Sequence, residues 1–156
     1  MPNTSPIPNK HLRLAYILTH SVLFIPVLLW PLPTIIFHNP MLHGILIPTW
    51  LTCIVIQLLV AAGMDSMLYK ISNAKQAIDA TLWIALLAMF SISTLQKQES
   101  AWMFGIFFLV HSCRAAAQLM QSEKNTTSWW LWLAWSRDIM TAVVIFVWSL
   151  ILTDLS

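Results

Sequence analysis

Charged residues are scarce in this chain. It has 156 residues, of which eight are Lys or Arg and six are Asp or Glu, so that only 9% are charged. An ordinary soluble domain has about 25%. Hydrophobic residues make up 58% of the sequence, and the mean hydropathy is +0.74. So few charges cannot cover a water-soluble fold, and they exclude a disordered tail and a basic domain that binds nucleic acid.

Glycine and cysteine are also rare. The three glycines form neither a phosphate-binding loop nor a GxxxG helix-packing motif. The two cysteines, Cys53 and Cys113, lie inside apolar runs, which is typical of thiols that act as small hydrophobes. Their number and spacing predict neither a disulfide framework nor a metal site. No motif in the sequence predicts a cofactor.

Five long apolar runs account for most of the chain. Each has 19 to 26 residues, and a helix needs about 20 apolar residues to cross a bilayer. We therefore predict one all-α domain over residues 12–153, a polytopic bundle of five transmembrane helices, preceded by a cytoplasmic tail at 1–11. The predicted spans are 12–37, 45–63, 77–95, 101–120 and 129–152.

Proline interrupts the first of these runs. Pro26, Pro31 and Pro33 all fall in its second half. Because proline lacks a backbone donor and clashes with the preceding helical turn, we expect the first helix to kink or end early.

The Lys and Arg residues of the short connections predict the orientation. With the N-terminus inside, the inside segments hold five of these cations and the outside segments hold only Lys97. Positive charge favours the cytoplasmic side, so we predict that the N-terminus is inside and the C-terminus outside. A bacterial inner membrane is the expected location. The five inside cations are Lys10, Arg13, Lys70, Lys75 and Lys124.

Polar residues inside the spans are the strongest pointer to function. Charges at membrane depth are costly, so they usually face a partner, a cavity or a functional site. At 1.5 Å per helical residue, seven of them fall in the same half of the membrane. These seven are His20, Asp65, Asp79, His111, Arg114, Arg137 and Asp138, with Asp65 at the inner boundary of the second span.

The leading interpretation is a polar pocket in the cytoplasmic half of the bundle. It would serve a non-enzymatic binding or transport-accessory protein whose ligand is an anionic small molecule, a lipid headgroup or a proton. Arginines suit phosphate or carboxylate, and histidines suit a proton. The small size of the chain also predicts a homo-oligomer or a partner membrane subunit. The six predicted site residues are Arg114, Arg137, Asp138, Asp79, His111 and His20.

The sequence leaves three other interpretations open. A membrane enzyme would act on a lipid or isoprenoid at the inner leaflet, with Asp138 or His111 as general base. A structural or immunity-type protein would work through helix contacts, and its polar residues would only join helices. Arg114 would then pair with Asp138 or Asp79, and Arg137 with Asp65 or with a phosphate at the membrane surface. A b-type haem held by His20 and His111 is the least favoured alternative.

Overall fold

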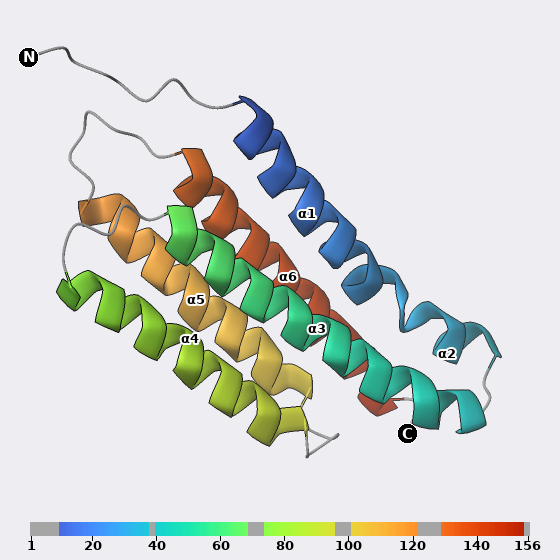
Figure 1. The fold of residues 1–156 in the computed structure, drawn as a ribbon. Coiled ribbons are helices and arrows are strands. Elements are labelled where there is room, and N and C mark those ends of the chain that lie inside the picture. Colours follow the sequence, from blue (N-terminus) through green and yellow to red (C-terminus); the bar gives the residue numbers. More distant parts are fainter. Residues whose placement is uncertain (1–9, 38–39, 69–73, 96–100, 122–128, 155–156) are drawn as a thin grey trace, which may run out of the picture.

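The protein is a bundle of helices (Figure 1). The computed structural model describes residues 10–37, 40–68, 74–95, 101–121 and 129–154. These residues form helices and no strand. The helices are α1 Lys10–Leu29, α2 Leu32–Phe37, α3 Pro40–Leu68, α4 Ala74–Leu95, α5 Ala101–Gln121 and α6 Trp129–Asp154.

Five helical segments are long and apolar enough to cross a membrane, which confirms the predicted all-helical fold and its five helices of spanning length. The largest boundary difference is in the second segment, which was predicted to end at residue 63 and continues to Leu68. Asp65 is therefore inside the helix, and its ion pair with Arg137 explains why a charge does not end the segment there. The segments are Lys10–Phe37, Gly44–Leu68, Gln76–Leu95, Ala101–Met120 and Trp129–Leu152.

The first segment is broken as the prolines predict. α1 ends at Leu29, and the chain resumes a helix at Leu32 after Pro31. Pro26 lies inside α1, and its carbonyl oxygen still accepts a hydrogen bond of 2.9 Å from the Trp30 amide. Of the predicted tail, residues 1–9 lie outside the described residues, and the last two already belong to α1.

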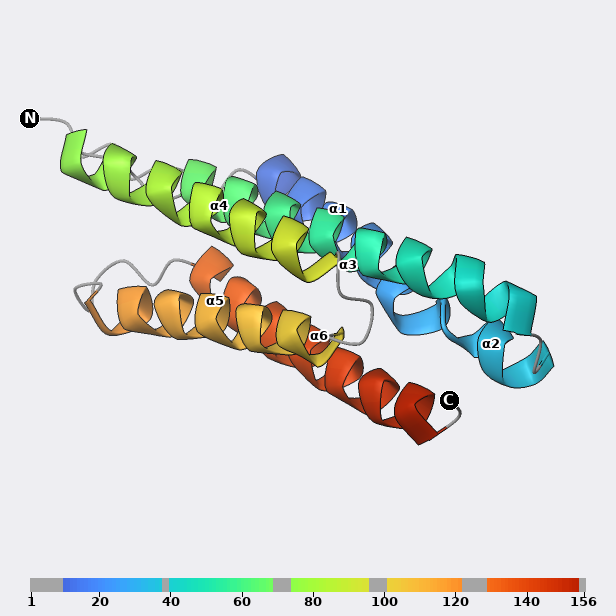
Figure 2. The ribbon, with the colours of Figure 1, turned by 90° about the horizontal axis from the view of Figure 1, so that it is seen from below.

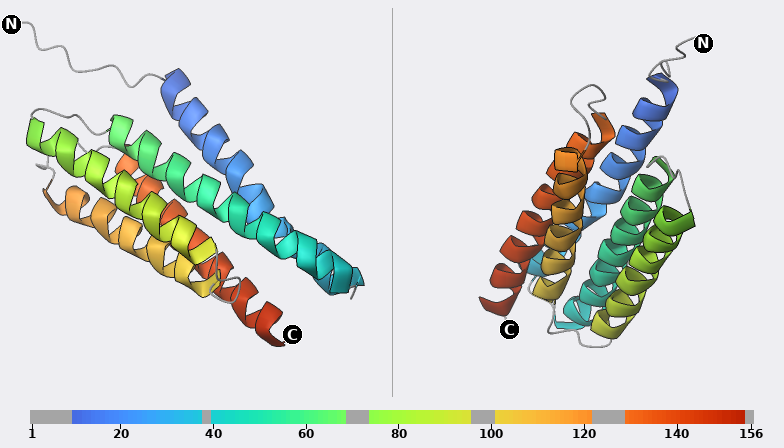
Figure 3. Two further views of the ribbon diagram at one scale, coloured as in Figure 1. Left: turned by 60° about the horizontal axis from the view of Figure 1, so that its bottom comes forward. Right: turned by 90° about the vertical axis from the view of Figure 1, so that its left-hand side faces the viewer.

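The helices lie in two layers, with α1, α3 and α4 in one and α5 and α6 in the other (Figure 2). α5 and α6 run side by side along most of their length, and α1 contacts both α3 and α6 (Figure 3). The close approach of α5 and α6 depends on Gly105, since a Cβ atom there would lie 2.8 Å from the Phe146 ring.

The buried charged side chains gather at one end of the bundle. The polar end is where α1, α4 and α6 begin and where α3 and α5 end (Figure 1). The other half is filled by a buried apolar core, in which large side chains of α3, α5 and α6 pack together. The largest of them are Trp50, Leu51, Ile54, Phe104, Phe108, Ile145 and Trp148.

Candidate functional site

A buried guanidinium stands at the centre of the polar end. Arg137 on α6 has a side chain that is only 8% exposed, and contacts from three helices surround it. Its neighbours lie on α1, α3 and α6, and α5 adds one more side chain to the group. We call these residues the polar cluster: Tyr16, His20, Asp65, His111, Arg137 and Asp138.

The contacts of Arg137 use all of its hydrogen-bonding capacity. Its Nε donates to Asp138 at 2.8 Å, and its Nη2 lies 2.9 Å from Asp65 and 2.7 Å from Asp138. Its Nη1 lies 2.8 Å from the Tyr16 hydroxyl and 3.0 Å from His20 Nε2. A guanidinium has five N–H donors, so these contacts leave Arg137 with no donor to offer to a further anion.

Two α1 side chains complete this network because they are four residues apart and so share one helix face. The Tyr16 hydroxyl accepts from Arg137 and donates to Asp65 at 2.6 Å. His20 Nε2 faces the guanidinium and must accept, which makes this imidazole neutral and puts its proton on Nδ1. That Nδ1 is buried and has no hydrogen-bond partner.

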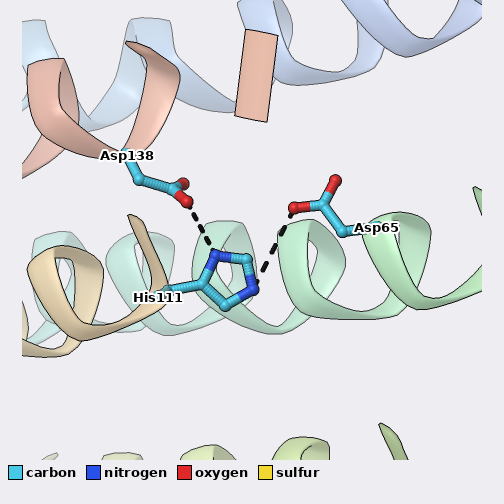
Figure 4. Close-up of side chains that lie close together, drawn as sticks. All are labelled: Asp65, His111 and Asp138. Atoms are coloured by element: carbon cyan, nitrogen blue, oxygen red, sulfur yellow. Dashed lines mark hydrogen bonds and ion pairs between the residues drawn. The ribbon is translucent and has the colours of Figure 1, made fainter. Parts of the chain in front are cut away.

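The imidazole of His111 lies between two carboxylates (Figure 4). Its Nδ1 is 2.7 Å from Asp138 Oδ2, and its Nε2 is 4.0 Å from Asp65 Oδ2. A neutral ring that donates from Nδ1 directs the lone pair of Nε2 towards a carboxylate oxygen, which is also an acceptor. A second proton on the ring converts this unfavourable meeting of two acceptors into a favourable charge pair.

The net charge of the polar cluster also favours a second proton on His111. Asp65 and Asp138 bring two negative charges and Arg137 brings one positive charge, while Tyr16 and His20 are neutral. The polar cluster therefore has a net charge of −1 when His111 is neutral, and becomes neutral when His111 is protonated. An uncompensated charge is costly in a medium of low dielectric constant. The cluster thus favours one added positive charge.

A cavity of about 490 Å³ reaches the polar cluster from between α3, α4, α5 and the start of α6. Asp65 and His111 form part of its wall, so the cavity reaches two members of the polar cluster. The rest of the wall combines two indoles, an ion pair, four alanines and three polar side chains. These residues are Trp83, Trp130, Asp79, Arg114, Ala62, Ala80, Ala115, Ala117, Ser66, Gln76 and Gln118.

Arg114 and Asp79 form a separate ion pair at the rim of this cavity. Arg114 Nη2 lies 2.9 Å from Asp79 Oδ2, and the two side chains are 23% and 74% exposed. The guanidinium also lies over the ring of Trp83 at 4.9 Å from its centroid. That ring in turn stacks on His111, with 6.1 Å between the ring centroids. The rim pair therefore reaches the polar cluster only through an aromatic ring.

The structure brings four of the six predicted site residues into the polar cluster and leaves the other two at the rim. Among the pairings considered from the sequence, Arg114 pairs with Asp79 and Arg137 with Asp65. Ligand binding by the six residues stays a prediction. The predicted site residues in the cluster are His20, His111, Arg137 and Asp138, and those at the rim are Asp79 and Arg114.

Two residues of the cluster were missing from the predicted site. Asp65 was assigned to the inner boundary of the second span because it follows Gly63, where the apolar run ends, and Tyr16 was left out of the predicted site although it shares a helix stripe with His20. The signal for both was helical spacing: Tyr16 is four residues before His20, and Asp65 is eight residues after the buried Gln57. Residues at such spacings share a face.

Neither a zinc ion nor a haem suits these side chains. One atom each of Asp65, His111 and Asp138 lie within 4.8 Å of one another. Ligand atoms in a tetrahedral zinc site are about 3.3 Å apart, and a divalent ion beside Arg137 would leave the cluster with a charge of +1. For haem, His20 Nε2 faces a guanidinium at 3.0 Å, which disfavours an iron ion at that nitrogen.

A single polar contact separates the polar cluster from the apolar core. Gln57 Nε2 donates to Thr141 Oγ1 at 3.0 Å, and both side chains are fully buried. Beyond this pair the described interior is mostly the apolar core, and its buried polar side chains there are those of Thr34, Ser91 and Thr94. The cavity is therefore a route to the cluster from the polar end, and the described residues form no comparable polar route from the other end.

Comparison of the chain with protein-family models, with curated proteins and with solved structures found no match.

Proposed function

We propose that this protein spans a membrane and binds one proton at His111, taken up through the cavity at the polar end. The observation that supports this most is the position of His111. Its ring lies between Asp138 and Asp65, within a cluster whose other charges sum to −1. Histidine is the side chain whose charge most readily changes near neutral pH.

Access from one side fits a binding role better than a channel. The apolar core fills the half of the bundle opposite to the cavity, so a proton that reaches His111 returns by the route it came. Such a site suits an accessory subunit that senses or buffers protons, or a carrier that must change conformation to release them. The proposal retains the sequence-based expectation of a homo-oligomer or a partner subunit in the bilayer.

The proposed orientation places the polar end and the cavity on the cytoplasmic side. It rests on the excess of Lys and Arg in the segments at that end, five against one. A bacterial inner membrane remains the location that we propose on the same sequence grounds.

An anionic ligand receives less support than a proton. Arg137 has no free donor, and Arg114 is already paired with Asp79. A membrane enzyme that holds a lipid phosphate would depend on the same two arginines. The contact between His111 and Asp138 does resemble a general base oriented by a carboxylate, which is the one observation in favour of the enzyme as second candidate.

Tryptophan emission offers a test, because the Trp83 ring stacks on the His111 ring. A charge that forms on His111 changes the electric field at the indole and hence its emission. We expect acid to change the emission of the wild type reversibly, and this change to be absent in His111→Gln and in Trp83→Phe. His11→Gln, at the exposed start of α1, is the matched control and should behave as the wild type. An acid response that persists in His111→Gln contradicts the proposal.

A further inference from the structure

The cavity next to His111 has the chemistry of a site for an organic cation. We propose, on the basis of the proton site above, that it binds a small protonated amine with an apolar body, in exchange for the proton on His111. The proposal rests on the charge of the cavity, on its aromatic wall and on two acceptor atoms 4.0 Å apart that belong to residues of this wall.

The charges around the cavity leave one negative charge to be matched. Three aspartates face two arginines over the polar cluster and the rim pair, so the sum is −1 when His111 is neutral. A monocation in the cavity matches this charge, and so does the proton on His111. Both together leave an excess of +1, so each disfavours the other. An anion would bring the sum to −2.

Two hydrogen-bond acceptors define the proposed position of the ammonium group. The neutral ring of His111 presents Nε2, and Asp65 presents Oδ2 at 4.0 Å from it, with both residues in the cavity wall. A primary ammonium has three N–H donors and bridges the two, as the proton of the charged imidazole otherwise does. The same gap therefore accepts either a proton or an amine.

The wall around this position suits the rest of such a ligand. Trp83 and Trp130 line the cavity, and an indole face attracts a cation within about 6 Å. The guanidinium of Arg114, 4.9 Å from the Trp83 centroid, already uses this attraction. Four alanines and the side chains of Ser66, Gln76 and Gln118 make up the remaining wall, and a volume of about 490 Å³ holds an amine with an aromatic or branched aliphatic body.

Calorimetry on the full chain in lipid nanodiscs tests the inference with three probes of one shape. We expect benzylammonium to bind, and benzyl alcohol and benzoate to bind at least tenfold more weakly. Because the proton on His111 and benzylammonium each disfavour the other, acidification should weaken benzylammonium binding. The affinity should fall by up to about tenfold per pH unit once His111 is protonated. Tighter binding of benzoate, or an affinity for benzylammonium that does not fall with acid, overturns the inference.

Lipid composition distinguishes a free amine from a headgroup amine. Phosphatidylethanolamine offers an ammonium but no net charge, so we expect equal benzylammonium affinity in nanodiscs of phosphatidylglycerol alone and in nanodiscs that also contain phosphatidylethanolamine. A weaker affinity in the second kind contradicts the assignment to a free amine and gives the site to the headgroup.

A pair of variants on α5 tests the place of the amine. Ala117→Trp places an indole at the wall of the cavity, whereas Cys113→Trp makes the same change one turn earlier, at a residue that does not line it, and both positions are exposed. Only Ala117→Trp should lose benzylammonium binding. Cys113→Trp should also keep the acid response of Trp83 emission, and the wild type itself separates the amine site from the proton site. An acid response without benzylammonium binding in the wild type overturns the amine site alone. Amine binding without that response overturns the proton site and the exchange.

Discussion

His111 on α5 and Asp138 on α6 meet in a hydrogen bond of 2.7 Å between side chains that are 5% and 0% exposed. The bond joins the two helices that contact each other most extensively. Asp138 also accepts from Arg137, so one carboxylate holds both a guanidinium and an imidazole. The stability of the polar end and the proposed proton site therefore depend on the same atoms.

Removal of the central cation should destabilise the protein strongly. Arg137→Met leaves Asp65 and Asp138 buried without their cation, and breaking a buried ion pair in this way costs about 3 to 5 kcal/mol. Arg114→Met is the matched control, because Arg114 pairs with a largely exposed carboxylate in an interaction of about 0 to 1 kcal/mol. Unfolding of both variants in mixed detergent micelles measures the difference. Equal losses in the two variants would show that Arg137 is not the centre of a buried network.

Neutralising Asp138 should remove the need for a proton. Asp138→Asn keeps the shape of the side chain but brings the polar cluster to zero net charge with His111 neutral. We therefore expect the acid response of Trp83 emission to disappear. Asp79→Asn, which alters only the rim pair, should keep that response. If Asp138→Asn responds to acid as the wild type does, the charge balance of the cluster does not control the proton.

The Tyr16 hydroxyl should contribute to stability through both of its hydrogen bonds. Tyr16→Phe leaves an Arg137 donor and an Asp65 oxygen with one partner fewer in a buried site, which costs about 1 to 3 kcal/mol. The phenyl ring still packs against Trp129, whose ring centroid is 5.8 Å away, so the loss reflects the hydroxyl. Equilibrium unfolding in detergent gives the value, and no measurable loss would mean that the hydroxyl is not part of the network.

Two glycine substitutions should act in opposite directions. Gly105→Ala places a methyl group 2.8 Å from the Phe146 ring and should cost about 1 to 3 kcal/mol through overpacking of α5 against α6. Gly63→Ala meets nothing within 4 Å and should gain up to about 1 kcal/mol from helix propensity. The melting temperatures of the two variants provide the comparison. A melting temperature for Gly105→Ala at or above that of the wild type contradicts the close helix contact.

The sequence was sufficient to predict the helices, because each spanning helix needs a long apolar run and the polar breaks between the runs are short. The break after Leu29 was also predictable, since Pro31 cannot continue the hydrogen bonding of α1. The end of the second span was not predictable from the sequence. Asp65 follows Gly63 and Met64 and resembles the start of a connection, and only its partner on α6 explains why it is buried.

The depth of the polar residues was predictable from their positions along each helix, but their pairing was not. Helical spacing places His111 and Arg114 on one stripe of α5, yet the structure directs His111 to α6 and Arg114 to α4. Which stripe faces which helix depends on how all five spans pack around one another. A single sequence contains no direct record of that packing, so Asp79 and Arg114 were assigned to the same site as Arg137.

Nitrogen-15 NMR of labelled histidine rings tests the proton site most directly. Signals lost in His111→Gln identify the ring, and the ring nitrogens report whether they are protonated. On acidification we expect both nitrogens of His111 to become protonated, while His20 Nε2, which faces Arg137, stays an acceptor. A His111 ring that keeps one protonation state over the whole pH range in which the protein remains folded would contradict the account.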